Sequence, residues 1–203
     1  MELGGNAPFI VFDDADIKAA LDLAIGIKFG NCGQICVAAN RFFIHKNIYD
    51  DFLTSYVKRA KNLKLGFGKD SDGDMGPLVN SQGQKRMLDI VSDAINKGAK
   101  IETGGKIPEG FDKGFWYEPT VLSNVTTDML AYQQEIFGPI APVFKFETEE
   151  EALELANDTE YGLASYLFTE NVERQARFAT ELQFGEVQIN GVKSVSYTHL
   201  TLP

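Results

Sequence analysis

The chain has 203 residues, 44% of them hydrophobic, which is long enough for one sizeable hydrophobic core, and we expect a single domain. Its net charge of −10 argues against nucleic acid or an anionic membrane as a partner, because both carry negative charge themselves. No segment approaches the ~18 uninterrupted apolar residues of a membrane span, and the start lacks the pattern of a signal peptide, so we expect a cytoplasmic protein.

Cysteine and histidine are too scarce for a disulfide framework or a metal site. The two cysteines, Cys32 and Cys36, lie four positions apart and do not make a disulfide framework. The two histidines, His45 and His199, are too scattered for a metal site. The sequence therefore predicts no bound metal.

Hydrophobic periodicity predicts strands and helices in alternation. Asp13 or Asp14 can cap the first helix, Asn47 the second and Thr148 a later one. In chain order we expect strands over 9–12, 41–45, 99–102, 140–146, 163–168 and 185–190, an extended aromatic segment over 116–122, and helices over 17–28, 49–60, 81–97, 149–156 and 172–182.

This alternation is typical of βαβ units, so we predict an α/β fold with a mostly parallel sheet. Pro142 lies inside a predicted strand and has no N–H to donate, which favours an edge strand or a bulge there. No internal repeat or low-complexity linker divides the chain.

The stretch from Phe29 to Cys36 reads FGNCGQIC and places a cysteine on a glycine-bearing turn. A nucleophilic cysteine needs a lowered pKa, partial exposure and oriented backbone N–H groups. Gly33 permits the tight turn, and Asn31 and Gln34 supply polar atoms nearby. The alternative is that Cys36 is a small buried hydrophobe, as most free cysteines are.

Two further motifs favour the catalytic interpretation. Glu2–Gly5 reads ELGG, and Glu135–Pro139 reads EIFGP. Together with Gly-Gln-x-Cys at the cysteine turn, they make the sequence resemble the aldehyde dehydrogenase superfamily, in which these motifs occur in this order. Glu2 and Cys36 lie 36 − 2 = 34 positions apart, as in that family. The resemblance implies the catalytic domain of the aldehyde dehydrogenase fold.

The resemblance also implies roles for the site residues and a cofactor, NAD or NADP. Cys36 is the nucleophile that attacks an aldehyde, and its backbone N–H is one donor to the oxyanion of the thiohemiacetal. Glu2 is the general base that activates water to hydrolyse the later thioester. Glu135 is implied to bind the nicotinamide ribose and Phe137 to pack beside the ring, although Glu135 can also be a surface carboxylate.

Asn190 and Cys32 each have two possible interpretations. Asn190, in the last predicted strand, is a candidate for the substrate site, but such an asparagine more often orients backbone. Cys32 is either a resolving partner of Cys36 or unconnected with it, and we favour the second interpretation.

The branch that the sequence resembles most is succinate semialdehyde dehydrogenase, judged from residues 2–16, 40–41 and 138–143. Two positions depart from it. That branch often has a carboxylate-binding arginine six residues before the nucleophile, where this chain has Gly30, and a cysteine two residues after it, where this chain has Ala38. Lactaldehyde or another small aldehyde is therefore the alternative substrate.

Relative to the family, residues 1–193 are expected to be a catalytic domain incomplete at both ends, without the Rossmann-type domain or the asparagine of the oxyanion hole. Residues 194–203 resemble the translation of a sequencing-library adapter, so we expect a non-native tail that gives His199 no function. The parent protein is expected to be a homo-oligomer. This chain alone is expected to be a non-catalytic fragment, with cofactor-free esterase-like activity at Cys36 as a further alternative.

Overall fold

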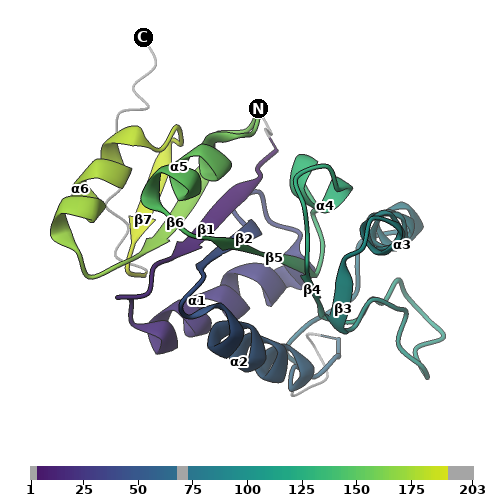
Figure 1. The fold of residues 1–203 in the computed structure, drawn as a ribbon. Coiled ribbons are helices and arrows are strands. Elements are labelled where there is room, and N and C mark those ends of the chain that lie inside the picture. The colour runs from purple at the N-terminus through teal and green to yellow at the C-terminus, as the bar shows by residue number, and fades with distance from the viewer. Residues whose placement is uncertain (1–3, 68–72, 192–203) are drawn as a thin grey trace, which may run out of the picture.

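The computed structural model describes residues 4–67 and 73–191. Its strands are β1 (Ala7–Val11), β2 (Ala39–His45), β3 (Lys100–Thr103), β4 (Thr120–Ser123), β5 (Ile140–Phe146), β6 (Ala164–Phe168) and β7 (Glu186–Ile189). They form one sheet in the order β3-β4-β5-β2-β1-β6-β7 (Figure 1). Among these seven strands of the described residues, β3 and β4 pair antiparallel, and all other neighbours are parallel. The predicted α/β fold with a mostly parallel sheet is thereby confirmed.

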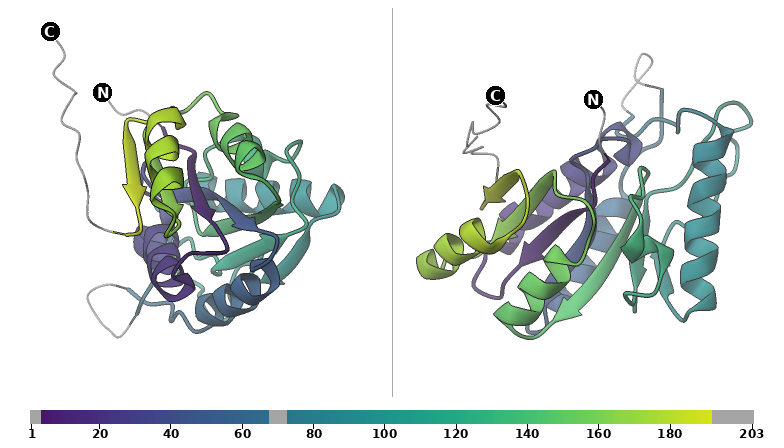
Figure 2. Two further views of the ribbon diagram at one scale, coloured as in Figure 1. Left: turned by 60° about the vertical axis from the view of Figure 1, so that its left-hand side comes forward. Right: turned by 90° about the horizontal axis from the view of Figure 1, so that it is seen from above.

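Helices cover both faces of the sheet. They are α1 (Ile17–Phe29), α2 (Tyr49–Lys61), α3 (Ser81–Asn96), α4 (Leu130–Gln133), α5 (Glu149–Asn157) and α6 (Val172–Glu181), with a short 3-10 segment η1 (Gly30–Gly33) after α1. Figure 1 shows α1 and α2 on one face and α4, α5 and α6 on the other. α3 lies at the end of the molecule opposite α6 and β7 (Figure 2).

The strands are buried because helices pack on both sides of them. β1, β4 and β6 are buried along their whole length. Phe9 of β1 contacts the rings of Phe42, Tyr166 and Phe168 on the two neighbouring strands. A parallel sheet covered on both faces requires apolar side chains on both faces of each strand, which is why these segments read as continuous apolar runs.

The predicted cap of α1 is wrong. Asp16 is the cap, and its side chain accepts a 3.0 Å hydrogen bond from the backbone N–H of Ala19. Asp14 instead accepts a 2.8 Å hydrogen bond from the Thr169 hydroxyl, and Asp13 accepts one of 2.7 Å from the Asn47 amide. These two carboxylates therefore hold the loop after β1 to neighbouring segments.

The cap of α2 also differs from the prediction, whereas that of α5 agrees with it. α2 begins after Ile48 and has no side-chain cap, because the amide of Asn47 is turned toward Asp13. Thr148 caps α5 as predicted, accepting from the N–H of Glu151 at 3.2 Å.

The prediction of an edge strand or a bulge at Pro142 is wrong, since β5 lies inside the sheet between β4 and β2 and its pairing with β4 keeps one register through Pro142. Pro142 pairs with Leu122 of β4, while the pairing of β5 with β2 begins one residue later, at Val143. Pro142, which has no N–H, thus lies where β5 is paired with β4 but not yet with β2. An interior strand tolerates proline here because the second ladder has not yet started.

Candidate active site

The cysteine turn adopts a left-handed backbone at the end of α1. Asn31, Cys32 and Gly33 have φ angles of 49°, 57° and 69°. Glycine adopts this region without strain and asparagine tolerates it, so two of the three residues suit the turn. A Cβ atom on Gly33 would lie 2.3 Å from the carbonyl oxygen of Gly138. The turn therefore packs directly on the main chain of the EIFGP motif.

Gln34 holds this turn against the segment before α3. Its side-chain nitrogen donates to the carbonyl oxygen of Asn31 at 3.2 Å, and its side-chain oxygen accepts from the N–H of Val79 at 2.9 Å. The Asn31 amide donates back to the carbonyl of Gln34 at 3.0 Å. These bonds fix the main chain two residues before Cys36.

Cys36 is half-buried and lies between η1 and β2, at the edge where parallel strands β1, β2 and β6 begin. The Tyr166 hydroxyl on β6 donates a 2.7 Å hydrogen bond to the carbonyl of Val37. Burial raises the pKa of Tyr166, with further upward effects from Glu186 and Cys36. The phenol therefore keeps its proton and acts as a donor beside the cysteine.

The glycines of the first motif contact both other motifs. A Cβ atom on Gly5 would lie 2.0 Å from the carbonyl oxygen of Cys36, and one on Gly4 would lie 2.7 Å from Oε2 of Glu135. The N–H of Gly5 donates a 2.8 Å hydrogen bond to Oε1 of Glu135. Three motifs that are separated in sequence thus meet at Gly4 and Gly5, which contact the main chain of Cys36 and the side chain of Glu135. Glu2, the predicted general base, lies outside the described residues.

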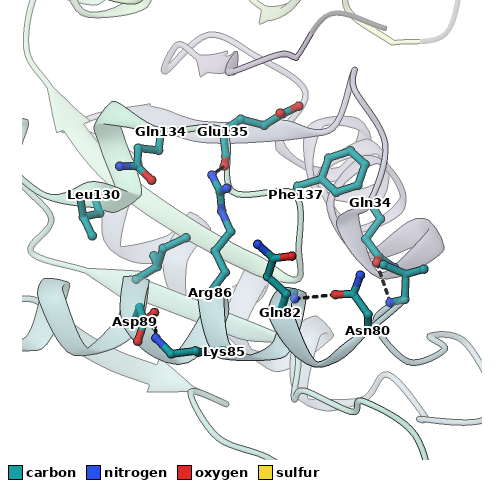
Figure 3. Close-up of a pocket in the computed structure, with 13 residues that line it drawn as sticks. Gln34, Asn80, Gln82, Lys85, Arg86, Asp89, Leu130, Gln134, Glu135 and Phe137 are labelled. Carbon is teal, nitrogen blue, oxygen red and sulfur yellow. Dashed lines mark hydrogen bonds and ion pairs between the residues drawn. The ribbon is translucent and has the colours of Figure 1, made fainter.

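Glu135 and Phe137 border a cavity of about 690 Å³ between α3 and the EIFGP motif. Arg86 reaches across from α3 and donates to the carbonyl oxygen of Glu135 (Figure 3). Phe137 has a φ of 50° and is 42% exposed, so its ring is available to pack against a ligand. Gln34 also lines this space, whereas Cys36 is not among its described lining residues. The volume suits a small-molecule ligand.

The two cysteines lie in different environments. Cys32 is buried, and burial raises the pKa of its thiol to about 12, although Lys28 opposes the shift. It is therefore a neutral thiol at physiological pH and a poor nucleophile. Cys36 is the more accessible sulfur, and both cysteines are free. This difference supports the interpretation that Cys32 is unconnected with Cys36.

The side chain of Asn190 is engaged with backbone. Its Oδ1 accepts from the N–H of Thr169 at 3.0 Å, and its Nδ2 donates to the carbonyl of the same residue at 2.8 Å. Asn190 follows the end of β7, whereas Cys36 precedes the start of β2, and the parallel register places these at opposite edges of the sheet. The contacts support the backbone-orienting alternative, and a role in substrate binding stays a prediction.

Two buried polar residues beside the site were not predicted from the sequence. Lys28 and Asn40 are 0% and 2% exposed and are joined by a 3.0 Å hydrogen bond from Nζ to Oδ1. The available signal was the position of Lys28 itself, which falls on the apolar stripe of α1 with Leu21 and Ala24. A charged residue on such a stripe indicates a buried polar partner.

Within residues 4–67 and 73–191, no helix has the length and apolar character needed to cross a membrane. The same ranges contain no cluster of three histidine, cysteine, aspartate or glutamate side chains that could hold a metal ion.

The chain is similar in sequence and in structure to known aldehyde dehydrogenases. The aldehyde dehydrogenase family model matches residues 1–201. The chain is 49% identical over 190 residues to succinate-semialdehyde dehydrogenase [NADP(+)] 2 of Schizosaccharomyces pombe, covering 94% of this chain and 38% of that protein. The structure of 3,6-anhydro-L-galactose dehydrogenase in complex with NAP superposes with a TM-score of 0.91 and 45% identity, covering 93% of this chain and 40% of that one.

Betaine aldehyde dehydrogenase from Staphylococcus aureus in complex with NAD+ gives a TM-score of 0.90 and 40% identity, covering 93% of this chain and 38% of that one. The chain therefore spans about two fifths of the length of these relatives. The family match and the agreement of the folds lead to one conclusion: the chain belongs to the aldehyde dehydrogenase family.

Proposed function

We propose that this chain supplies the nucleophile and the cofactor-facing carboxylate of an NAD(P)-dependent enzyme that oxidises a small aldehyde to its carboxylate. The observation that carries the proposal is the meeting of the three motifs. Gly5 lies against Cys36, Gly33 lies against Gly138, and the Gly5 N–H holds Glu135. A thiol is thus fixed relative to the carboxylate of Glu135, a residue that lines a ligand-sized cavity.

Cys36 begins the reaction. Its thiolate attacks the aldehyde carbon and forms a C–S bond, and the carbonyl oxygen becomes the oxyanion of a thiohemiacetal. The backbone N–H of Cys36 is one donor to that oxyanion. Loss of hydride from the same carbon leaves a thioester on Cys36. Water activated by Glu2 then releases the carboxylate and the free thiol.

NAD or NADP supplies the hydride acceptor when it is bound. Glu135 fits a role in holding its ribose, because the carboxylate accepts hydrogen bonds from hydroxyl groups. Phe137 fits a role beside the ring, since it is exposed next to the cavity. The cavity volume of about 690 Å³ is large enough for part of such a ligand.

For the substrate we propose succinate semialdehyde, in keeping with the name of the S. pombe relative. Lactaldehyde or another small aldehyde is the second candidate, and it is favoured by Gly30, which offers no cation for a substrate carboxylate. The choice between these two substrates depends on whether another positively charged residue of the complete enzyme binds the substrate carboxylate, since Gly30 cannot.

The test is to graft this chain in place of the matching segment of the S. pombe relative and to measure NADP-dependent oxidation of succinate semialdehyde and lactaldehyde. We expect Cys36→Ala to lower kcat by at least about 10³-fold while cofactor binding remains. Glu2→Gln should slow the release of acid from the acyl-enzyme. The matched control is Cys32→Ala, which should keep its activity.

Retained oxidation in the Cys36→Ala graft would refute the proposed nucleophile. A release rate unchanged by Glu2→Gln would remove Glu2 from its role. Ester hydrolysis by the 203-residue chain that requires Cys36 but no cofactor would instead support the esterase-like alternative.

A further inference from the structure

A continuous series of hydrogen bonds runs beneath the candidate site. Lys28 Nζ donates to Oδ1 of Asn40 at 3.0 Å, and Nδ2 of Asn40 donates to the carbonyl oxygen of Gly5 at 3.0 Å. The N–H of Gly5 donates to Oε1 of Glu135 at 2.8 Å. The series begins on α1, passes through β2 and ends at the carboxylate of Glu135, a residue that lines the cavity.

The start of this series is costly to bury. The side chain of Lys28 is 0% exposed, and an ammonium group removed from water loses its hydration free energy. Leucine or methionine would fill the same stripe of α1 without that cost. The hydrogen bond to Asn40 satisfies one donor of Lys28, and it also orients the amide that holds Gly5.

Two titratable groups face Lys28. Burial lowers the pKa of Lys28 to about 7, while Cys32 of η1 and Glu135 before β5 raise it. Because Cys32 keeps its proton, Glu135 is the negative charge that the ammonium faces. Lys28 also lies in the last turn of α1, where the helix dipole favours a positive charge.

We propose that Lys28 is a positioning residue that, through Asn40, fixes the main chain of Gly5 and thereby the carboxylate of Glu135. The inference rests on the proposed function, which makes Glu135 and Cys36 the groups to be positioned. Gly5 also lies against the carbonyl of Cys36, so one buried network sets the nucleophile and the carboxylate relative to each other.

The Gly5 amide reports directly on this network, because its hydrogen is the one donated to Glu135. Hydrogen exchange can be measured by NMR on the 203-residue chain. Lys28→Met keeps an apolar stem of similar length and removes the donor to Asn40. We expect the Gly5 amide to exchange about tenfold faster in this variant, since one supporting hydrogen bond is lost. The amide of Val143 in β5 serves as the reference for overall stability.

Lys18→Met is the matched control on the same helix. Lys18 is exposed and pairs with Asp22 on the surface, so its removal should leave exchange at Gly5 unchanged. A general loss of stability would instead accelerate Gly5 and Val143 together in either variant.

A second readout separates positioning from simple packing. In the wild-type chain, the NMR signals of the Asn40 side-chain amide and of the Gly5 N–H should both shift with pH, with a common midpoint near pH 7. The titration should disappear in Lys28→Met. In Glu135→Gln it should move to lower pH, because the carboxylate that raises the pKa of Lys28 is removed.

The proposal is overturned if Lys28→Met folds and its Gly5 exchange rate stays within about twofold of wild type. If that variant does not fold, Asn40→Asp provides the same test: it keeps an acceptor for Lys28 but removes the donor to Gly5. Unchanged exchange in Asn40→Asp also overturns it. Neither measurement requires turnover, so a failure of the proposed catalysis is distinguishable from a failure of this inference.

Discussion

Gly5 and Cys36 are in contact through the main chain alone: a Cβ atom on Gly5 would lie 2.0 Å from the carbonyl oxygen of Cys36. The two residues belong to different motifs and lie 36 − 5 = 31 positions apart in the sequence. Any side chain at position 5 must push the strand that begins after Cys36 away from β1. The glycine is therefore a steric requirement of the site.

Gly5→Ala should destabilise the 203-residue chain. We expect the free energy of unfolding to fall by about 1–3 kcal/mol, because backbone must shift to admit the methyl group. Gly26→Ala is the matched control, since a Cβ atom there meets no atom within 4 Å inside α1. That control should gain about 0.5–1 kcal/mol from helix propensity. Equal urea midpoints for the two variants would contradict the steric argument.

The two cysteines should react with iodoacetamide at very different rates. At pH 8 we expect Cys36 to be modified first and Cys32 more slowly by roughly 10²-fold or more, because burial and a raised pKa suppress its thiolate. Mass spectrometry of digested peptides locates the label. In urea both sulfurs should react at similar rates, and preferential labelling of Cys32 in the folded chain would contradict the structure.

Stability should rise with pH between about 7 and 8.5 because of Lys28. Its pKa is about 7 in the folded chain and 10.5 for a lysine exposed to water, so the unfolded chain binds more protons in this window. The expected gain is of the order of 1 kcal/mol. Above pH 9 the raised pKa of Cys32 acts in the opposite direction, which sets the upper limit.

Urea unfolding at pH 7 and pH 8.5 measures this gain. Lys28→Met should abolish it, and Lys18→Met should keep it. If Lys28→Met gains as much stability between pH 7 and pH 8.5 as the wild type does, another group causes the effect.

Gly30 offers a test of substrate choice. Its φ and ψ of −54° and 136° are open to any residue, and a Cβ atom there meets no atom within 4 Å. In the grafted enzyme, Gly30→Arg should lower KM for succinate semialdehyde by about tenfold through a charged hydrogen bond to the carboxylate. KM for propanal should not change. Gly26→Arg is the control, and an equal effect on both aldehydes would exclude a carboxylate contact.

Periodicity predicted most of the fold, because long strands and helices leave a repeated pattern in the sequence. It missed α4, which has four residues and is too short to show a helical period. It predicted an edge strand or a bulge at Pro142, since a sequence does not reveal where one ladder stops and the next begins. Asp16 was overlooked as a cap because three aspartates compete for that position within four residues.

The candidate site was predictable as separate motifs, and its assembly was not. Resemblance singled out Cys36, Glu135 and Phe137, but the contacts between Gly33 and Gly138 depend on the order of strands in the sheet. Lys28 lies on the apolar stripe of α1, and periodicity does not distinguish a buried amine from a buried methyl group. Side-chain burial in three dimensions was required to identify it.

The position of β1 inside the sheet, between β2 and β6, has a consequence for synthesis of the chain. β1 pairs with β2, which follows it closely, and with β6, which begins at Ala164. Gly5 and Glu135 are 130 positions apart. The cysteine turn therefore leaves the ribosome long before Glu135 has been synthesised. In the meantime β1 and β2 each keep one unpaired edge, because their later partners β6 and β5 do not yet exist. A nascent chain that stops before Glu135 contains the nucleophile but lacks the EIFGP residues that pack against the cysteine turn and accept from Gly5.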